Sequence, residues 1–254
     1  MKALTKLTLF AAVALAFTAC KKDEDPEPTP TTPVTYSLKL EFEFLAGMMP
    51  YDLNTLLADS SGTLMKFDKV RFFASNTELM DMMGNEMEHY HDVYMLVDAD
   101  NSSNVFTLGN SFDGHVHMLK FNVGLDSAAN HNTLLEMAPA PLNDGTMHWG
   151  WNPMAGYKFI VLEGRWDSDG NDLIDPTDDT FVYHVATDAL LGEKMVMSHT
   201  DITADGNTTW AMHVDMAALA AAIDYSEHPD THTNNDLPLA IRVRDALLAS
   251  ISIH

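Results

Sequence analysis

The chain has 254 residues, of which 37 are acidic and 14 are basic, giving a formal net charge of −23 at pH 7. Nucleic acids and anionic membrane surfaces attract clustered positive charge, so this balance argues against nucleic acid as a partner. With 46% apolar and 20% charged residues, the chain is neither a disordered acidic tail nor a multi-span membrane protein. Seventeen Met and 12 His accompany a single Cys. Thioethers and imidazoles bind soft and borderline metal ions without thiolates, which makes metal binding the first function to consider.

Residues 1–19 have the pattern of a bacterial lipoprotein signal peptide. Lys2 and Lys6 precede an apolar run, 7–17, that is shorter than the roughly 20 residues needed to span a bilayer. Thr18, Ala19 and Cys20 resemble the end of such a signal, where the Cys thiol is lipidated. The alternative is a plain secretory signal with an incidental Cys. If Cys20 is lipidated, the folded domain has no thiol, which excludes disulfides and thiolate metal sites.

The segment after Cys20 is predicted to be a tether. Residues 20–34 are rich in acidic residues and Pro, a composition that favours extended polyproline II and builds no core. We therefore expect a protein of the bacterial cell envelope, held by its lipid at the outer membrane, on its periplasmic or surface face. Contact with the membrane is expected through the lipid anchor only.

Residues 35–254 are predicted to form one mostly β domain. Apolar and polar residues alternate from Tyr36 to Phe44, which predicts a half-buried strand. Further strands are predicted at Lys66–Ala74, Val93–Val97, His115–Val123, Tyr157–Glu163, Phe181–Ala186, Lys194–Ile202 and Thr208–Val214. One or two short C-terminal helices are predicted at Met216–Ile223 and Leu239–Ser250. Strands do not alternate regularly with helices, which favours an antiparallel β-sandwich or barrel-like domain.

One acidic loop has the spacing of a calcium site. Side-chain oxygens fall at positions 1, 3, 5, 9 and 12, with the carbonyl of Leu173 at position 7; they come from Asp167, Asp169, Asn171, Asp175 and Asp178. The opening resembles the calcium loops of thrombospondin type 3 and dockerin modules. It departs from the EF-hand, because Gly stands at position 4 and Asp at position 12. We expect a structural clamp; the alternative is an acidic turn between two strands.

Met and His are densest between Met80 and His91, where four Met accompany His89 and His91. Thioethers suit Cu(I) and imidazoles suit Cu(II), so this segment is a candidate copper site. The alternative is that its Met residues fill core gaps and its His residues end a hairpin.

A second group of candidate ligands is distributed over several predicted strands. His115 and His117 are two residues apart, so both project from one face of a strand. That face also carries Leu119 and Phe121, so the alternative is that these His are core or boundary residues. Further candidates on other strands are His184, Met195, Met197, His199, Met212 and His213. The chain has no HExxH, CxxC or Gly-rich phosphate loop, so we do not expect an enzyme.

A family resemblance is carried by short motifs that occur in a fixed order. They include Met147-His-Trp-Gly-Trp151, then Gly156-Tyr157, Leu162-Glu-Gly164 and Phe181-Val-Tyr-His184. Phe67–Asn76, Tyr94–Asp98 and Phe121–Ser127 precede them. In this order the chain resembles the MbnP-like copper-binding family over about residues 36–225. Met-x-Trp-x-Trp followed by Gly-Tyr and Leu-Glu-Gly is the most specific part.

The resemblance implies a β-rich, extracytoplasmic copper-binding protein. Related copper proteins use His together with a Trp oxidised to kynurenine, and a MauG-like dihaem cytochrome c peroxidase is the implied partner for that oxidation. By position, Trp149 and Trp151 are the candidates for oxidation, and His184 occupies the Tyr-His position. The family often has Gly-Gly soon after this His, whereas Val185 and Ala186 follow here. We add His89, His91, His115, His117 and His148 as possible ligands from their chemistry alone.

Two functions follow as hypotheses. The first is a lipid-anchored copper-binding protein for copper acquisition, storage or delivery, without turnover of its own. The second is a calcium-stabilised surface adhesion or glycan-binding lipoprotein, which would use the same anchor and tether.

Overall fold

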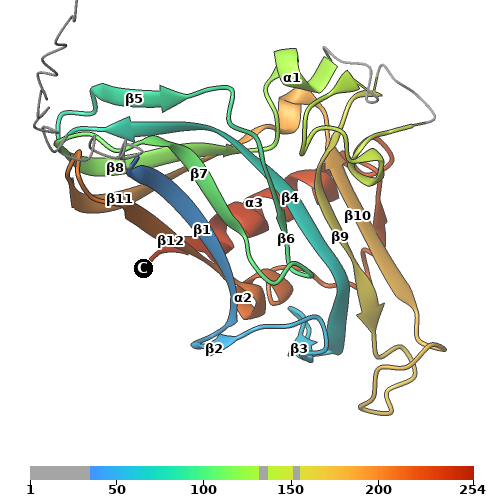
Figure 1. Ribbon diagram of the computed structural model, residues 1–254. Coiled ribbons are helices and arrows are strands. Elements are labelled where there is room, and N and C mark those ends of the chain that lie inside the picture. The colour runs from blue at the N-terminus through green and yellow to red at the C-terminus, as the bar shows by residue number, and fades with distance from the viewer. Residues whose placement is uncertain (1–34, 132–136, 151–154) are drawn as a thin grey trace, which may run out of the picture. The chain divides into compact units, whose positions relative to one another are not determined.

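The structure is a computed structural model (Figure 1), and it describes residues 35–131, 137–150 and 155–254. These residues belong to one unit, Thr35–His254. The predicted signal peptide, Cys20 and the tether lie outside the described residues. Within the described part of the chain, no helix is both long enough and apolar enough to cross a membrane.

Two β-sheets form the domain. The smaller sheet has the order β14-β12-β1-β2, with β7 also pairing with β1. The larger sheet has the order β11-β8-β4-β9-β10-β13, with β3, β5 and β6 also pairing with β4. The strands are β1 (Ser37–Ala46), β2 (Met49–Pro50), β3 (Leu57–Ala58), β4 (Leu64–Met80), β5 (Glu86–Tyr90), β6 (Met95–Asp98), β7 (Val105–Asn110), β8 (Gly114–Val123), β9 (Lys158–Trp166), β10 (Thr180–Ala186), β11 (Gly192–Ile202), β12 (Thr208–Asp215), β13 (Asp230–Thr231) and β14 (Ile251–Ile253).

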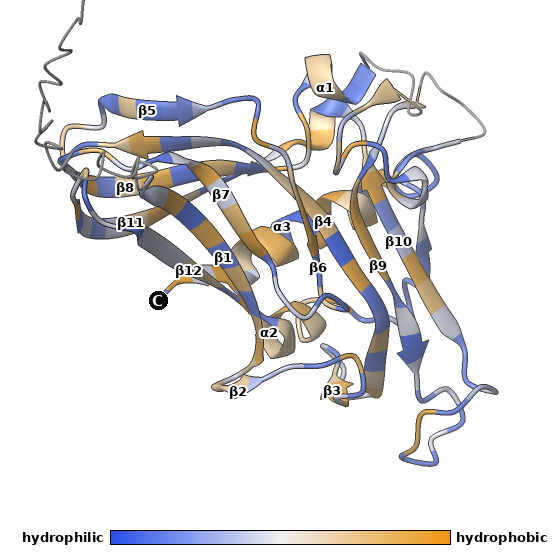
Figure 2. Ribbon diagram, viewed as in Figure 1, coloured by the Kyte–Doolittle hydropathy of each residue, from blue (hydrophilic) through white to orange (hydrophobic). Residues whose placement is uncertain are grey.

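The alternating pattern of β1 places its apolar side chains in the core. Leu38, Leu40 and Phe42 are buried, while the polar residues between them are partly exposed. Figure 2 shows the same alternation of hydrophobic and hydrophilic residues along β1 and β4. The core is rich in aromatic residues; Phe42, for example, makes edge contacts with Phe72 and Phe121. The prediction of a mostly β sandwich is therefore confirmed, and the sheets are not closed into a barrel.

Strand direction differs from the prediction in one respect. Most neighbouring strands are antiparallel, but β1 runs parallel to β12 over eight residue pairs, from Leu38↔Thr208 to Leu45↔Asp215. The short β13 is also parallel to β10. Periodicity in a single strand identifies its buried face but not the direction of its neighbour, so sequence alone could not reveal this pairing.

The two predicted C-terminal helices are present as α2 (Met216–Ala220) and α3 (Leu237–Ser250). Each begins at an Asp whose carboxylate accepts backbone N–H groups of the first turn, Asp215 in α2 and Asp236 in α3. Helix α3 contacts strands of both sheets, including β10, β11 and β12. A shorter helix, α1 (Ser127–His131), and the 3₁₀ turns η2 (Gly145–Met147) and η4 (Asp188–Leu190) lie in the connections.

Candidate metal centre

Two His side chains meet at the edge of the larger sheet formed by β10 and β13. His184 lies near the end of β10, and His232 directly follows β13. Their Nδ1 atoms are 3.0 Å apart, and their ring centroids are separated by 4.8 Å. The side chain of His184 is 11% exposed and that of His232 is 46% exposed, so the pair lies between the core and the solvent.

A carboxylate lies against the remote nitrogen of each ring. His184 Nε2 is 2.9 Å from Glu163 Oε1, and His232 Nε2 is 3.3 Å from Asp230 Oδ1. A carboxylate at Nε2 favours a proton there, and a metal ion could take the place of the proton shared between the two Nδ1 atoms. Glu163 belongs to the Leu-Glu-Gly motif, so this contact gives the motif a physical role.

The pKa shifts of His184 and Glu163 suit a neutral imidazole at His184. Burial lowers the pKa of His184, although the hydrogen bond to Glu163 opposes that change. The hydrogen bond from His184, together with one from Lys69, lowers the pKa of Glu163 to about 2. At neutral pH, Glu163 is therefore an ionised acceptor and His184 is an uncharged donor.

Trp149 completes the cluster. Its ring lies 5.6 Å from that of His184 and 5.9 Å from that of His232, measured between centroids. The Nζ of Lys158 lies 5.2 Å from the centre of the indole. Indole offers an N–H donor and no metal-binding lone pair, so an unmodified Trp149 is a neighbour of the pair rather than a ligand.

The Met-His-Trp and Gly-Tyr motifs position Trp149. The backbone N–H of Trp149 donates to the Gly156 carbonyl at 3.0 Å. Gly156 has φ +69, and a Cβ there would lie 2.2 Å from Asn130 Oδ1, so only Gly fits. The same Oδ1 accepts the backbone N–H of Tyr157 at 2.7 Å, and the Tyr157 hydroxyl donates to the Leu142 carbonyl.

A cavity of about 700 Å³ opens beside the cluster. Trp149 and His232 line it, together with His131 and Asp188, whose Nε2 and Oδ1 atoms are 3.1 Å apart. Two further lining residues, Thr187 and Thr233, have positive φ values of 78° and 68°, which are uncommon for a β-branched residue. Thr233 also donates its hydroxyl to the His184 carbonyl, which ties the 231–235 loop to β10.

The remaining predicted copper ligands do not join this pair. His148 is buried against Tyr157, with ring centroids 4.8 Å apart, and burial followed by the charge of Lys158 lowers its pKa. Its Nδ1 makes no hydrogen bond to a described residue. Trp151 lies outside the described residues.

The Met-rich segment 80–91 forms a plain hairpin between β4 and β5. Asp81 accepts backbone N–H groups in the turn, and Met82 and Met83 are 75% and 79% exposed. His89 Nε2 is 2.8 Å from Asn76 Oδ1. Among the described residues, no group of three His, Cys, Asp or Glu side chains with metal-ligand spacing includes His89 or His91.

His115 and His117 do form such a group, with His199 of β11 as the third member. His115 is exposed and His117 is half-buried, whereas Val116 between them is fully buried. Burial, and after it the proximity of His199 and His115, lowers the pKa of His117. This trio lies on β8 and β11, at the opposite edge of the larger sheet from His184.

Three of the six predicted calcium ligands come together. Asp167, Asp169 and Asp178 offer carboxylate oxygens that all lie within 4.8 Å of one another. Asp175 instead accepts the backbone N–H and the hydroxyl of Thr177. Asn171 donates its amide to Asp169, and Leu173 is exposed. The arrangement also fits an acidic turn closed by its own backbone N–H groups, so calcium stays a prediction.

Sequence reasoning missed His232. His232 lies in a loop, two residues after Asp230, where the sequence has no periodic pattern. It is 48 residues away from His184 along the chain. Its one local signal is the carboxylate at Asp230, which is too common a spacing to identify a ligand. The parallel pairing of β13 with β10 and the hydrogen bonds of Thr233 to β10 bring the two rings together.

Comparison with known proteins identifies the family. The MbnP family model matches residues 35–235. Among solved structures, MbnP from Methylosinus trichosporium is similar at 18% sequence identity, with 75% of this chain and 80% of that chain covered and a TM-score of 0.49. A search of curated proteins found no match. Because the family match spans most of the chain and includes the motifs that hold Trp149 and His184, the protein belongs to the MbnP family.

Proposed function

We propose that this protein binds copper outside the cytoplasm, at a centre formed by His184 and His232 beside Trp149. The MbnP family is associated with copper, which gives the metal its identity. The observation that carries the proposal is the arrangement of the two rings, with their Nδ1 atoms facing each other and a carboxylate behind each Nε2.

The spacing of the two nitrogens fits one ion. Imidazole nitrogens bind transition-metal ions at about 2.0–2.1 Å. Two nitrogens at adjacent positions of one ion therefore lie about 2.9–3.3 Å apart. The separation of 3.0 Å between His184 Nδ1 and His232 Nδ1 falls in this range. Two imidazoles without thiolates suit copper, which also binds most tightly among first-row divalent ions.

Oxidation of Trp149 would complete the coordination shell. Trp takes up O₂ and water and releases formate, giving kynurenine, whose new amine and ketone are metal-binding groups that indole lacks. O₂ is the oxidant in this step, and a MauG-like dihaem cytochrome c peroxidase would catalyse it. Contact with both imidazoles favours Trp149 for this role, and its position in the cavity supports access.

The physiological role we propose is copper acquisition, storage or delivery by a lipid-anchored protein. The net charge of −23 attracts cations to the surface. Anchoring through Cys20 would keep the domain at the envelope. Replacing Cys20 with Ser should release the protein from the membrane fraction, and unchanged retention would contradict the anchor.

The copper centre is tested by titrating purified protein with copper against a competing chelator. We expect His184→Ala and His232→Ala each to weaken binding at this centre by 100-fold or more, since each removes one of two protein ligands. His91→Ala is the matched control. His91 is exposed and belongs neither to the His184–His232 pair nor to the group of His115, His117 and His199. Equal affinities in all four proteins would exclude this centre.

Kynurenine is tested separately by mass spectrometry of protein from its native host. Conversion of Trp149 should raise the mass of its peptide by about 4 Da. Absence of that change in native protein would exclude the modification while leaving the two-His centre standing.

A further inference from the structure

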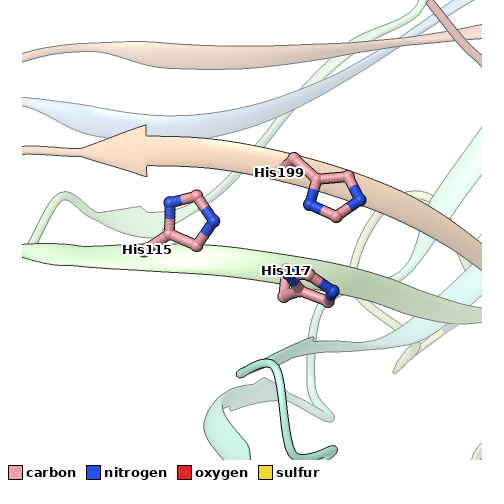
Figure 3. Close-up of side chains that lie close together, drawn as sticks. All are labelled: His115, His117 and His199. Carbon is pink, nitrogen blue, oxygen red and sulfur yellow. The ribbon is translucent and has the colours of Figure 1, made fainter.

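Three His side chains gather on the exposed surface of β8 and β11, far from Trp149. Figure 3 shows His115 and His117 on one strand and His199 on its neighbour, with the rings grouped together. The ring centroids of His117 and His199 are 4.1 Å apart, and those of His115 and His117 are 6.2 Å apart. One nitrogen from each ring lies within 4.8 Å of the other two.

A β-bulge brings His199 into this group. The register of β11 against β8 shifts between Met197 and Thr200, where β11 carries one residue more than its partner. His199 lies in the bulge and has φ 49°, in the left-handed region that few residues other than Gly adopt. Bulges of this kind re-aim a side chain. Here the re-aimed ring packs edge-on against His117.

A carboxylate orients the third ring. His115 Nδ1 is 2.7 Å from Asp201 Oδ1. Asp201 lies on β11, the strand that also carries His199. This contact leaves Nε2 of His115 available, and Figure 3 shows that nitrogen on the side toward His117 and His199. A carboxylate behind a ligating imidazole is the usual support of a His metal site.

This group and the Trp149 centre cannot share an ion. His184 lies opposite Val161, which pairs with Arg71 of β4, while Met118, next to His117, pairs with Met80 of β4. At about 3.3 Å per residue, the nine residues from Arg71 to Met80 separate the two places by on the order of 30 Å.

We propose that His115, His117 and His199 form a second metal site, which binds a borderline divalent transition ion and leaves one coordination position open to solvent. Three imidazoles without a thiolate, with an open position, are the donor set of such ions, and copper(II) binds most tightly within this class. The site stands on its own geometry and does not depend on the copper centre at His184. To bind one ion, the three nitrogens would move from within 4.8 Å of one another to about 3.3 Å.

The test is a titration of the full-length protein with copper(II), and separately with zinc(II), followed by calorimetry and electron paramagnetic resonance. The expected wild-type result is about two copper equivalents of different affinity. His117→Ala and His199→Ala should each remove the copper equivalent of the trio, with its nitrogen hyperfine signal, and leave the equivalent at His184 in place. His184→Ala should remove the equivalent at His184 and leave that of the trio, and His91→Ala should leave both in place. Zinc should bind the trio with one equivalent that His117→Ala abolishes.

A support test separates a true site from adventitious His binding. Asp201→Asn should weaken the trio by about 10- to 100-fold while leaving all three imidazoles in place. Circular dichroism checks that each variant is folded, as expected for substitutions on the exposed face. An unchanged equivalent in the His117→Ala/His199→Ala double variant would overturn the proposal. If one equivalent is lost in His117→Ala but none in His184→Ala, the second site stands and the copper centre proposed above fails.

Discussion

The His184–His232 pair and the Met80–His91 hairpin differ in how the chain brings metal-binding atoms together. The hairpin has four Met and two His within twelve residues, yet its thioethers at Met82 and Met83 point into solvent and His89 is held by Asn76. The pair draws its residues from positions 48 apart and supplies each ring with a carboxylate. A centre therefore depends on convergent and supported donor atoms, and local density of donors is a poor guide to it.

The largest expected effect comes from the backbone that positions Trp149. In Gly156→Ala, the new Cβ would lie 2.2 Å from Asn130 Oδ1 at a φ of +69°. We expect a loss of about 2–4 kcal/mol in the free energy of unfolding, from overpacking added to the backbone penalty. Urea denaturation measures it, and copper affinity should fall with it.

Gly47→Ala is the matched control for this variant. Gly47 has a similar φ of +64°, but a Cβ there would meet no described atom within 4 Å. It should cost about 1 kcal/mol through the backbone conformation alone. Equal losses in the two variants would show that Asn130 does not constrain this turn.

The next effect concerns the carboxylates behind the paired rings. Glu163→Gln and Asp230→Asn keep both imidazoles but remove the charge at Nε2. Copper affinity should fall about 10- to 100-fold, as for other residues that support a ligating His. Glu88→Gln in the hairpin is the control. Should Glu163→Gln bind copper as tightly as the wild type, the Leu-Glu-Gly motif would have no role in the centre.

Glu163 also predicts a dependence of stability on acid. Its pKa in the folded protein is about 2, below the usual value for Glu in an unfolded chain of about 4.3. The ionised Glu163 carboxylate therefore stabilises the folded protein fully above about pH 4.3, and this contribution is lost as the pH falls toward 2. Urea midpoints measured across this range should fall less steeply in Glu163→Gln than in the wild type. An exposed glutamate variant, Glu227→Gln, should follow the wild-type curve.

Calcium offers a smaller effect, at the turn between β9 and β10. If Asp167, Asp169 and Asp178 bind calcium, its addition should raise the melting temperature by about 2–4 °C. Asp169→Ala should abolish the increase, whereas Asp100→Ala, in an exposed turn after β6, should preserve it. An identical melting temperature with calcium and with a chelator would leave this loop as an ordinary acidic turn.

The smallest effect is expected in the hairpin itself. Met82→Ala combined with Met83→Ala removes two exposed thioethers. Stability should change by less than about 0.5 kcal/mol, and copper affinity by less than about twofold. Chelator competition checks the affinity. A large loss of copper binding would show that the Met80–His91 hairpin binds copper.

Sequence predicted the features that depend on local periodicity. The alternation in β1 and β12 was predicted because a buried face leaves a local pattern of apolar residues. The start of α2 at Met216 was predicted, whereas α2 ends at Ala220, before the predicted Ile223, and α3 begins at Leu237, before the predicted Leu239. Strand β5 was missed because its residues are exposed or half-buried on both faces. Strand β7 was also missed, although its Leu108 is buried, and so were β2, β3, β13 and β14, which are too short to show a period. Periodicity therefore found the longer strands of the core and overlooked β5, β7 and the shortest strands.

The candidate sites were less readable for a related reason. The family motifs made His184, Trp149 and Trp151 candidates, but the loop position of His232 carries no motif. The bulge at His199 depends on the pairing of β11 with β8, which no single strand encodes. Site residues that are brought together by the pairing of distant strands cannot be predicted from the residue pattern of a single strand.

The parallel pairing of β1 with β12 has a consequence for how the chain folds. The two strands are about 170 residues apart along the chain, and β12 in turn pairs with β14 at the C-terminus. On a growing chain β1 can pair with β2 and β7, but the smaller sheet stays incomplete until β12 and β14 have been made. Until then Leu38, Leu40 and Phe42 have no partner strand on that side, and such non-local closure makes folding slow and dependent on the whole domain.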